Sequence, residues 1–173
     1  MINKIIYLAA GKAKLNFDNV VYNDYEIERD INKDMMEVDL TDYDLIVATP
    51  PCNYWSRANC NINSAYSQKT KHLLPFIIWK CIAVGKPFIV ENVINKRRMY
   101  FIEEVKKYCY YKEHGRHSYF MSHDIDISSV PQIQDFKYGG YFINKGDNKQ
   151  GGSNVNNVIE KYINSIKELL KDE

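Results

Sequence analysis

Two apolar segments of the chain each run into a side chain that can do chemistry. Residues 44–50 lead through Pro50-Pro51 to the thiol of Cys52, and residues 87–90 lead to the carboxylate of Glu91. Apolar runs of this length are typical of buried strands. Because chemistry collects at the carboxyl ends of parallel strands, both groups are expected in one crevice. The two prolines restrict the backbone before Cys52, which predicts a rigid loop for the thiol.

The other apolar segments alternate between strand and helix patterns. Strands are predicted over 5–9, 20–22, 37–39, 45–48, 88–90 and 118–121. Helices are predicted over 71–84, where Gly85 is placed to end the helix, over 98–111, and over 155–170, where apolar residues recur at helical spacing. Residues 135–153 are rich in Gly, Asn and Lys and are predicted to be a loop. This alternation favours a single α/β domain over residues 1–173, with a mostly parallel sheet and helices on both faces.

Charge and cysteine content narrow the class of protein. The 23 Lys and Arg residues nearly balance the 22 Asp and Glu residues, so the chain has no overall electrostatic footprint for nucleic acid, although Lys96-Arg97-Arg98 could contact phosphates locally. The four cysteines have no Cys-x-x-Cys spacing and no signal peptide ahead of them. The apolar stretch from Leu73 to Val84 is too short to span a bilayer. We therefore expect a soluble cytoplasmic protein with reduced thiols.

Three short motifs follow one another along the chain. Pro51-Cys52-Asn53 is followed by Glu91-Asn92-Val93 and then by Arg116-His117-Ser118-Tyr119-Phe120. In this order they resemble the nucleophile loop, the Glu-Asn-Val motif and the arginine motif of the cytosine-5 DNA methyltransferases, which are S-adenosylmethionine-dependent enzymes on a Rossmann-like fold. The resemblance implies that Cys52, Glu91 and Arg116 are catalytic, in an enzyme that methylates C5 of cytosine in DNA.

Further segments are similar to those that hold S-adenosylmethionine in that family. The turn at residues 7–11 is similar to its first motif, and Asn23-Asp24-Tyr25 to the acidic and aromatic step that holds the ribose and stacks the adenine. Asp39-Leu40 is similar to the motif that receives the adenine amino group, and residues 149–155 to the C-terminal motif that closes over the cofactor. The cofactor-binding residues implied by the resemblance are Leu8, Ala9, Gly11, Asp24, Tyr25, Asp39, Leu40, Pro50, Asn154 and Val155.

The chemistry of the family gives each catalytic residue a role. A cysteine thiolate adds to C6 of the base, so that C5 can attack the activated methyl group; this role falls to Cys52. The addition places negative charge toward N3 and O2 of the ring. A protonated Glu91 at N3 and the cation of Arg116 near O2 would stabilise that charge. Single-stranded DNA would avoid the cost of flipping the base out of a duplex.

The chain departs from the family pattern in three places. Its first motif keeps only Gly11, and the Ala13 and Lys14 that follow would crowd the cofactor unless the turn takes another path. The second arginine of the arginine motif is Ser118. Only about 25 residues separate Asp124 from Lys149, so the long target-recognition region is missing. The spacing of the histidines and Cys109 fits no zinc pattern, and no metal site is expected.

These departures leave three functions open. The chain is a minimal cytosine-5 methyltransferase, a non-catalytic relative that binds a nucleic acid or a protein, or a catalytic subunit whose recognition module is supplied by a separate chain. The expected partners are DNA and either a separate recognition subunit or a second copy of the chain in a homodimer. The turn from Ala10 to Lys14 discriminates the first two, because it decides whether the cofactor binds. Binding to DNA by the chain alone is expected to be weak and to favour single strands.

Overall fold

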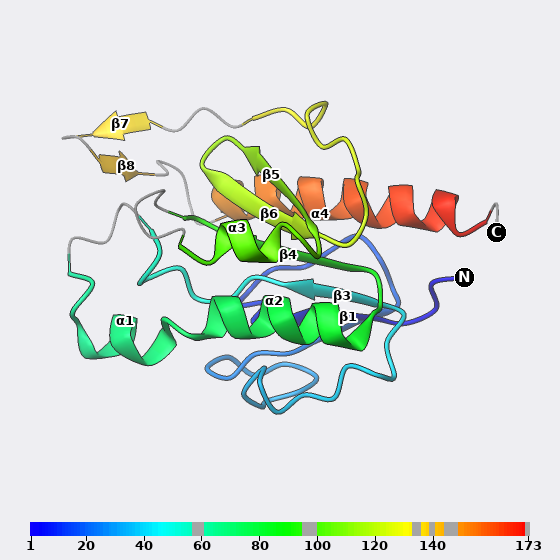
Figure 1. The fold of residues 1–173 in the computed structure, drawn as a ribbon, viewed down its shortest axis with the longest axis horizontal. Helices are drawn as coiled ribbons and strands as arrows, with labels where there is room; N and C mark the ends of the chain where they lie inside the picture. Colours follow the sequence, from blue (N-terminus) through cyan, green and yellow to red (C-terminus); the bar gives the residue numbers. More distant parts are fainter. Residues whose placement is uncertain (57–60, 95–99, 133–135, 139–140, 144–148, 172–173) are drawn as a thin grey trace.

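Six strands form the central sheet of the chain (Figure 1). The structure is a computed structural model that describes residues 1–56, 61–94, 100–132, 136–138, 141–143 and 149–171. The strands are β1 (Ile5–Leu8), β2 (Val20–Tyr22), β3 (Leu45–Ala48), β4 (Phe88–Asn92), β5 (Tyr110–His114) and β6 (His117–Met121). They lie in the order β2-β1-β3-β4-β6-β5. Five of the six predicted strands are thereby confirmed.

The sheet is mixed, with three parallel pairings out of five, so the predicted mostly parallel sheet is confirmed in part. Strands β2, β1, β3 and β4 pair in parallel, but β6 runs antiparallel to both of its neighbours, β4 and β5. The cause is the tight turn between β5 and β6. Gly115 has a φ of 62°, and such left-handed backbone allows a two-residue hairpin turn with Arg116. The hairpin inserts β6 between β4 and β5.

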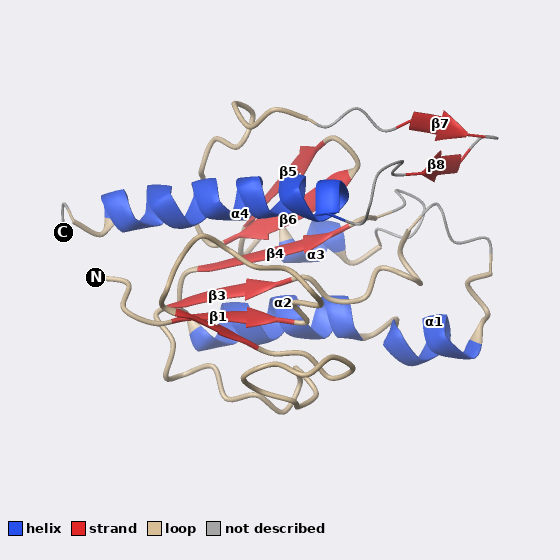
Figure 2. Cartoon of the chain, turned by 180° about the vertical axis from the view of Figure 1, so that it is seen from behind, coloured by secondary structure: helices blue, strands red, loops and turns tan. Residues whose placement is uncertain are grey.

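Helices cover both faces of the sheet, as predicted. They are α1 (Ala65–Thr70), α2 (Leu73–Val84), α3 (Ile102–Val105) and α4 (Lys149–Leu169). Alternate residues of the strands point to opposite faces. On β1, Ile6 packs in the core shared with α2 and α3, whereas Ile5 and Tyr7 pack in the core shared with α4. Figure 2 shows α4 in front of the sheet and α2 behind it.

The two long helices follow the predicted pattern closely. Helix α2 ends where Gly85 adopts the left-handed conformation, with φ of 70°. On α4 the residues at helical spacing, Val158, Ile159, Tyr162, Ile163 and Ile166, are all fully buried. Leu169, predicted to share that face, is half exposed instead, because it lies at the last turn of the helix. No helix within the described ranges combines the length and the apolar character needed to cross a membrane.

Residues 37–39 form a turn and not the predicted strand. The ammonium group of Lys80, on α2, donates hydrogen bonds to the carbonyl oxygens of Met36 (2.8 Å) and Val38 (2.7 Å). These acceptors are thereby satisfied without a neighbouring strand. The segment is tied to a helix, so it does not join the sheet.

Two other predictions about local structure are wrong. The predicted helix over 98–111 is only the short α3, because Tyr110 and Tyr111 belong to β5, where Tyr111 packs on Phe120 with ring centroids 5.2 Å apart. The predicted loop over 135–153 contains two short strands, β7 (Phe136–Tyr138) and β8 (Tyr141–Ile143), and the first turns of α4. Both views place the β7–β8 hairpin at the same end of the molecule as α1.

Candidate functional site

A cavity of about 610 Å³ lies at the point where the strand order reverses. The chain passes from β1 to β2 on one side of β1, and β3 lies on the other side. Such a reversal leaves a crevice at the carboxyl ends of the strands, where ligands bind in open α/β sheets. The lining includes Ala9 after β1, residues 23–26 after β2, residues 49–53 after β3, Glu91 of β4, and Arg116 and His117 at the start of β6. Its size suits a small organic ligand.

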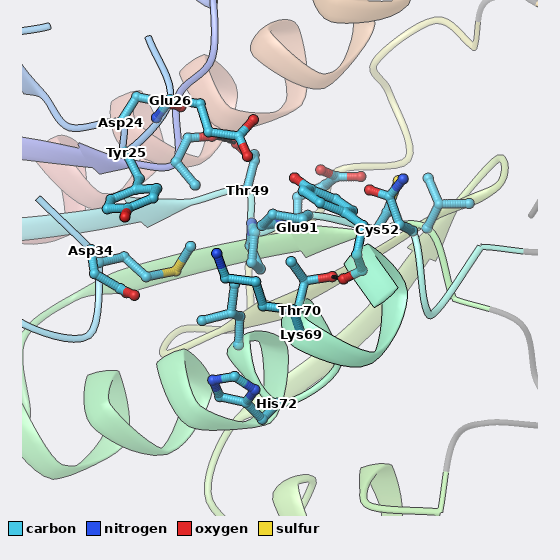
Figure 3. A pocket seen from close by; sticks show the side chains of 18 of the residues that line it. Asp24, Tyr25, Glu26, Asp34, Thr49, Cys52, Lys69, Thr70, His72 and Glu91 are labelled. Atoms are coloured by element: carbon cyan, nitrogen blue, oxygen red, sulfur yellow. Dashed lines mark hydrogen bonds between the residues drawn. The ribbon is translucent and has the colours of Figure 1, made fainter. Parts of the chain in front are cut away.

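The three residues with predicted catalytic roles, Cys52, Glu91 and Arg116, all line this cavity. The thiol and the carboxylate arrive on neighbouring parallel strands, as the sequence predicted, and the guanidinium arrives on the turn between β5 and β6. Figure 3 shows Cys52 and Glu91 at one end of the cavity and Asp24, Tyr25 and Asp34 at the other. The cavity therefore has a reactive end and an acidic, aromatic end.

The loop that carries Cys52 is fixed by backbone contacts and by one buried side chain. The carbonyl oxygen of Cys52 accepts hydrogen bonds from the backbone N–H groups of Trp55 (2.9 Å) and Ser56 (2.7 Å). Trp55 is fully buried against the aromatic rings of Tyr54 and Phe101. These contacts stabilise the conformation of the loop that the two prolines were predicted to make rigid.

Burial is the main influence on the Cys52 thiol. Loss of solvent raises the pKa of Cys52 above that of an ordinary thiol, and the negative charge of Glu91 raises it further, while the cation of Arg116 acts in the opposite direction. The thiol is therefore mostly protonated near neutral pH. Addition to a ring carbon would require that its proton be removed as the substrate binds.

Glu91 forms a short contact with a histidine that the sequence did not single out for this site. The Nδ1 atom of His117 lies 2.6 Å from Oε1 of Glu91, and both side chains are nearly buried, with 13% and 10% of their surface exposed. The sheet register explains the contact, because Glu91 pairs with Tyr119 and side chains two residues apart share one face of a strand. The alternation of side chains along β6 indicates which residues share a face with His117, but the register between β4 and β6 that brings His117 to Glu91 cannot be predicted from the sequence.

Asp24, at the acidic end, is largely occupied by backbone donors. Its Oδ2 accepts from the Gly11 N–H (2.8 Å), and its Oδ1 accepts from the N–H groups of Glu26 (2.8 Å) and Ile27 (3.1 Å). A carboxylate offers about four acceptor positions, so one stays open. The neighbouring Tyr25 is 69% exposed and lines the cavity. An open acceptor beside an exposed aromatic ring suits the hydroxyls and the flat base of a nucleoside.

The turn after β1 is held by charged side chains in place of the missing glycines. Arg29 donates from its Nε atom to the carbonyl oxygen of Gly11 (2.7 Å) and from its terminal nitrogen to that of Ala13 (3.0 Å). Ala9 has a φ of 50°, a left-handed conformation that costs a residue with a Cβ atom about 1 kcal/mol. Neither Ala13 nor Lys14 is among the residues that line the cavity.

Several residues implied by the resemblance lie outside the cavity lining. Leu8 and Leu40 are buried in the core beneath α2, and Val155 packs in the core beneath α4. The Asp39 carboxylate accepts hydrogen bonds from the backbone (2.9 Å) and hydroxyl (2.8 Å) of Thr41. Gly11 contacts the lining residue Asp24, to which its N–H donates. The side chain of Asn154 and the basic run at residues 96–98 lie outside the described residues.

Other residues line the cavity that the sequence did not suggest. Asp34 and Met35 line the cavity whereas Asp39 and Leu40 do not, because the segment before residue 40 is a turn and not a strand. Helix α1 contributes Tyr66 and Lys69, whose Nζ atom lies 5.9 Å from the centre of the Tyr25 ring. No local pattern predicts these positions, since they depend on how α1 and the 34–38 turn pack.

Within the described part of the chain, no cluster of three or more His, Cys, Asp or Glu side chains is arranged to hold a metal ion. Comparison of the sequence with protein-family models and with curated proteins finds no match. What the chain does must therefore be argued from the cavity and its side chains.

The first prediction concerns the reactivity of Cys52 toward iodoacetamide. Because the pKa of Cys52 is raised, its thiolate appears only as the pH approaches that higher value, so the alkylation rate should be low at pH 7 and still rise above pH 9. Mass mapping of the modified peptide in a Cys60→Ser background measures this rate. A plateau below pH 8 would contradict the expected direction.

Glu91→Gln removes the negative charge beside the thiol and should speed alkylation of Cys52 severalfold at pH 8, since each unit of pKa changes the thiolate fraction tenfold. Glu103→Gln is the matched control, because Glu103 is exposed on α3 and lies outside the cavity lining. Equal rates in the two variants would mean that the charge of Glu91 does not act on the thiol.

Proposed function

We propose that the chain is an S-adenosylmethionine-dependent methyltransferase that acts on C5 of cytosine in DNA through a covalent bond from Cys52. The observation that carries this proposal is the convergence of a thiol, a carboxyl group and a guanidinium on one end of a single cavity. A pyrimidine ring needs these three groups at once, because attack at C6 must be matched by stabilisation of charge at N3 and O2.

Each of the three residues at the reactive end has a separate role in this reaction. Cys52 supplies the sulfur that bonds to C6 and leaves again after C5 has lost its proton. Glu91 presents its carboxyl group to N3, and Arg116 places positive charge near O2. The short distance from the β3 loop to β4, fixed by the hydrogen bond from Asn92 to the Pro50 carbonyl oxygen (2.8 Å), keeps the thiol and the carboxyl group in register.

The other end of the cavity fits the cofactor. S-adenosylmethionine supplies the activated methyl group when it is bound. Asp24 offers one open acceptor for a ribose hydroxyl, and the exposed ring of Tyr25 offers a surface for the adenine. Asp34 lines the same end and offers a second carboxylate for the amino group of the base. Ala9 and Pro50 complete the wall between the two ends.

A non-catalytic protein that binds nucleic acid or a protein partner is the second candidate function. Two observations favour it: the raised pKa of Cys52 and the use of most of the Asp24 carboxylate by backbone donors. A catalytic subunit with a separate recognition chain is a variant of the first proposal. It would supply the recognition surface that the short segment between Asp124 and Lys149 lacks.

A mechanism-based trap tests the covalent step. A single-stranded oligonucleotide that contains 5-fluorocytosine should form a stable adduct with the wild-type chain in the presence of S-adenosylmethionine, because the fluorine at C5 cannot leave as a proton does. Cys52→Ser should abolish the adduct, since an alcohol is a far weaker nucleophile than a thiol near neutral pH. Cys109→Ala, at a buried cysteine away from the cavity, should still form it. An adduct that maps to another residue would refute the mechanism.

A matched pair of substitutions tests which acidic residue contacts the cofactor. Asp34 accepts a hydrogen bond from the Met36 N–H (3.0 Å) and Asp39 one from the Thr41 N–H (2.9 Å), so each substitution removes a bond to the N–H two residues further on. Asp39→Ala also removes the bond from the Thr41 hydroxyl (2.8 Å). Asp34→Ala should weaken S-adenosylmethionine binding by about 1.5 to 3 kcal/mol, the usual value of a hydrogen bond to a charged group. Asp39→Ala should leave the affinity unchanged. Weaker binding in Asp39→Ala and unchanged affinity in Asp34→Ala would instead identify Asp39 as the residue that contacts the cofactor, as the resemblance implies.

A further inference from the structure

The contact between Glu91 and His117 decides where a proton can sit on the carboxyl group. Only one proton fits between Nδ1 of His117 and Oε1 of Glu91, which are 2.6 Å apart. If the carboxyl proton occupies this position, Oε2 can only accept hydrogen bonds. If the imidazole supplies the proton instead, Oε2 is the one carboxyl oxygen left to carry an acid proton.

Oε2 is the oxygen available to a ligand. Among the described residues it accepts no hydrogen bond, and Glu91 lines the cavity at its reactive end. The carboxylate acts electrostatically on the Cys52 thiol and on the hydroxyls of Tyr7 and Tyr119, and Arg116, from the hairpin turn, acts on the same thiol. Both tyrosine hydroxyls are buried and have their pKa values raised, so they stay protonated. None of these groups competes for the proton between Nδ1 and Oε1.

While the Glu91 carboxylate is ionised it can only accept hydrogen bonds, so the histidine nitrogen 2.6 Å from it must then carry a proton. This places a hydrogen on Nδ1 of His117. A cytosine ring presents a bare nitrogen at position 3, so its binding requires a second proton, and Oε2 is the atom that can hold it. A uracil ring presents an N–H at position 3 and pairs with the ionised Oε2 directly.

We propose that His117 is a positioning residue that donates its Nδ1–H to Oε1 of Glu91 and thereby fixes the acid proton of Glu91 on Oε2, the oxygen that meets ring position 3 of the substrate. This inference deepens the proposed function and rests on it for the identity of the substrate. Its consequence is that an ionised Glu91 must take up one proton on Oε2 to bind cytosine and none to bind uracil.

The tautomer of His117 is measurable without cofactor or substrate. Nitrogen-15 spectra of the histidine rings in the full chain, with His117→Asn used to identify the His117 signals, should show Nδ1 protonated when the ring is neutral. Glu91→Gln keeps an acceptor oxygen and should preserve this tautomer, whereas Glu91→Leu should abolish the preference. A neutral His117 with its proton on Nε2 and a bare Nδ1 would overturn the proposal.

Adduct formation separates positioning from a steric role. Asn can donate one N–H from nearly the same place as Nδ1, so His117→Asn should retain the rate of adduct formation within about fivefold. His117→Leu fills the space without a donor and should lose at least tenfold, with cofactor affinity unchanged in both. Equal losses in the two variants would overturn the positioning role. If the wild-type chain forms no adduct at all, the proposed function fails while the tautomer measurement still decides the state of the pair.

Discussion

One buried hydrogen bond joins the two strand ends on which the site depends. The side-chain amide of Asn92 donates to the carbonyl oxygen of Pro50 at 2.8 Å, which ties the end of β4 to the loop after β3. Glu91 lies one residue before Asn92, and Cys52 lies two residues after Pro50. This single interaction therefore sets the separation of the two reactive groups. The contact is fully buried, where a hydrogen bond is costly to leave unmade. The short hairpin turn of β5 and β6 then adds Arg116 and His117 to the same place.

The acidic end of the cavity relies on charged side chains to shape the backbone. Arg29 and Asp24 hold the turn after β1, where the chain has only one glycine in left-handed conformation. The turn therefore has its conformation without a bound ligand. Backbone N–H groups occupy most of the acceptor positions of the Asp24 carboxylate as a result. The balance between preorganisation and open acceptor sites would decide how tightly the proposed cofactor is held.

The reactive end could be predicted from the sequence because its residues follow buried strands directly. Cys52 and Glu91 end apolar runs, and the parallel pairing of β3 and β4 brings such ends together without any knowledge of loops. The acidic end could be predicted less well, because Asp34 reaches the cavity through a turn that Lys80 holds from another element. The contribution of His117 to the site could not be predicted for a similar reason, because its contact with Glu91 depends on the register of an antiparallel strand pair. Long-range contacts of these kinds leave no local pattern in the sequence.

Calorimetric titration with S-adenosylmethionine tests most directly whether one cavity holds both a nucleoside cofactor and a pyrimidine ring, as proposed. Saturable binding of one cofactor per chain, well below millimolar concentration and weakened when Asp24 is replaced, is the predicted result. Absence of any binding heat at millimolar cofactor would contradict the claim. The chain would then have to be regarded as a binding protein that retains the thiol and the sheet without the methyl donor.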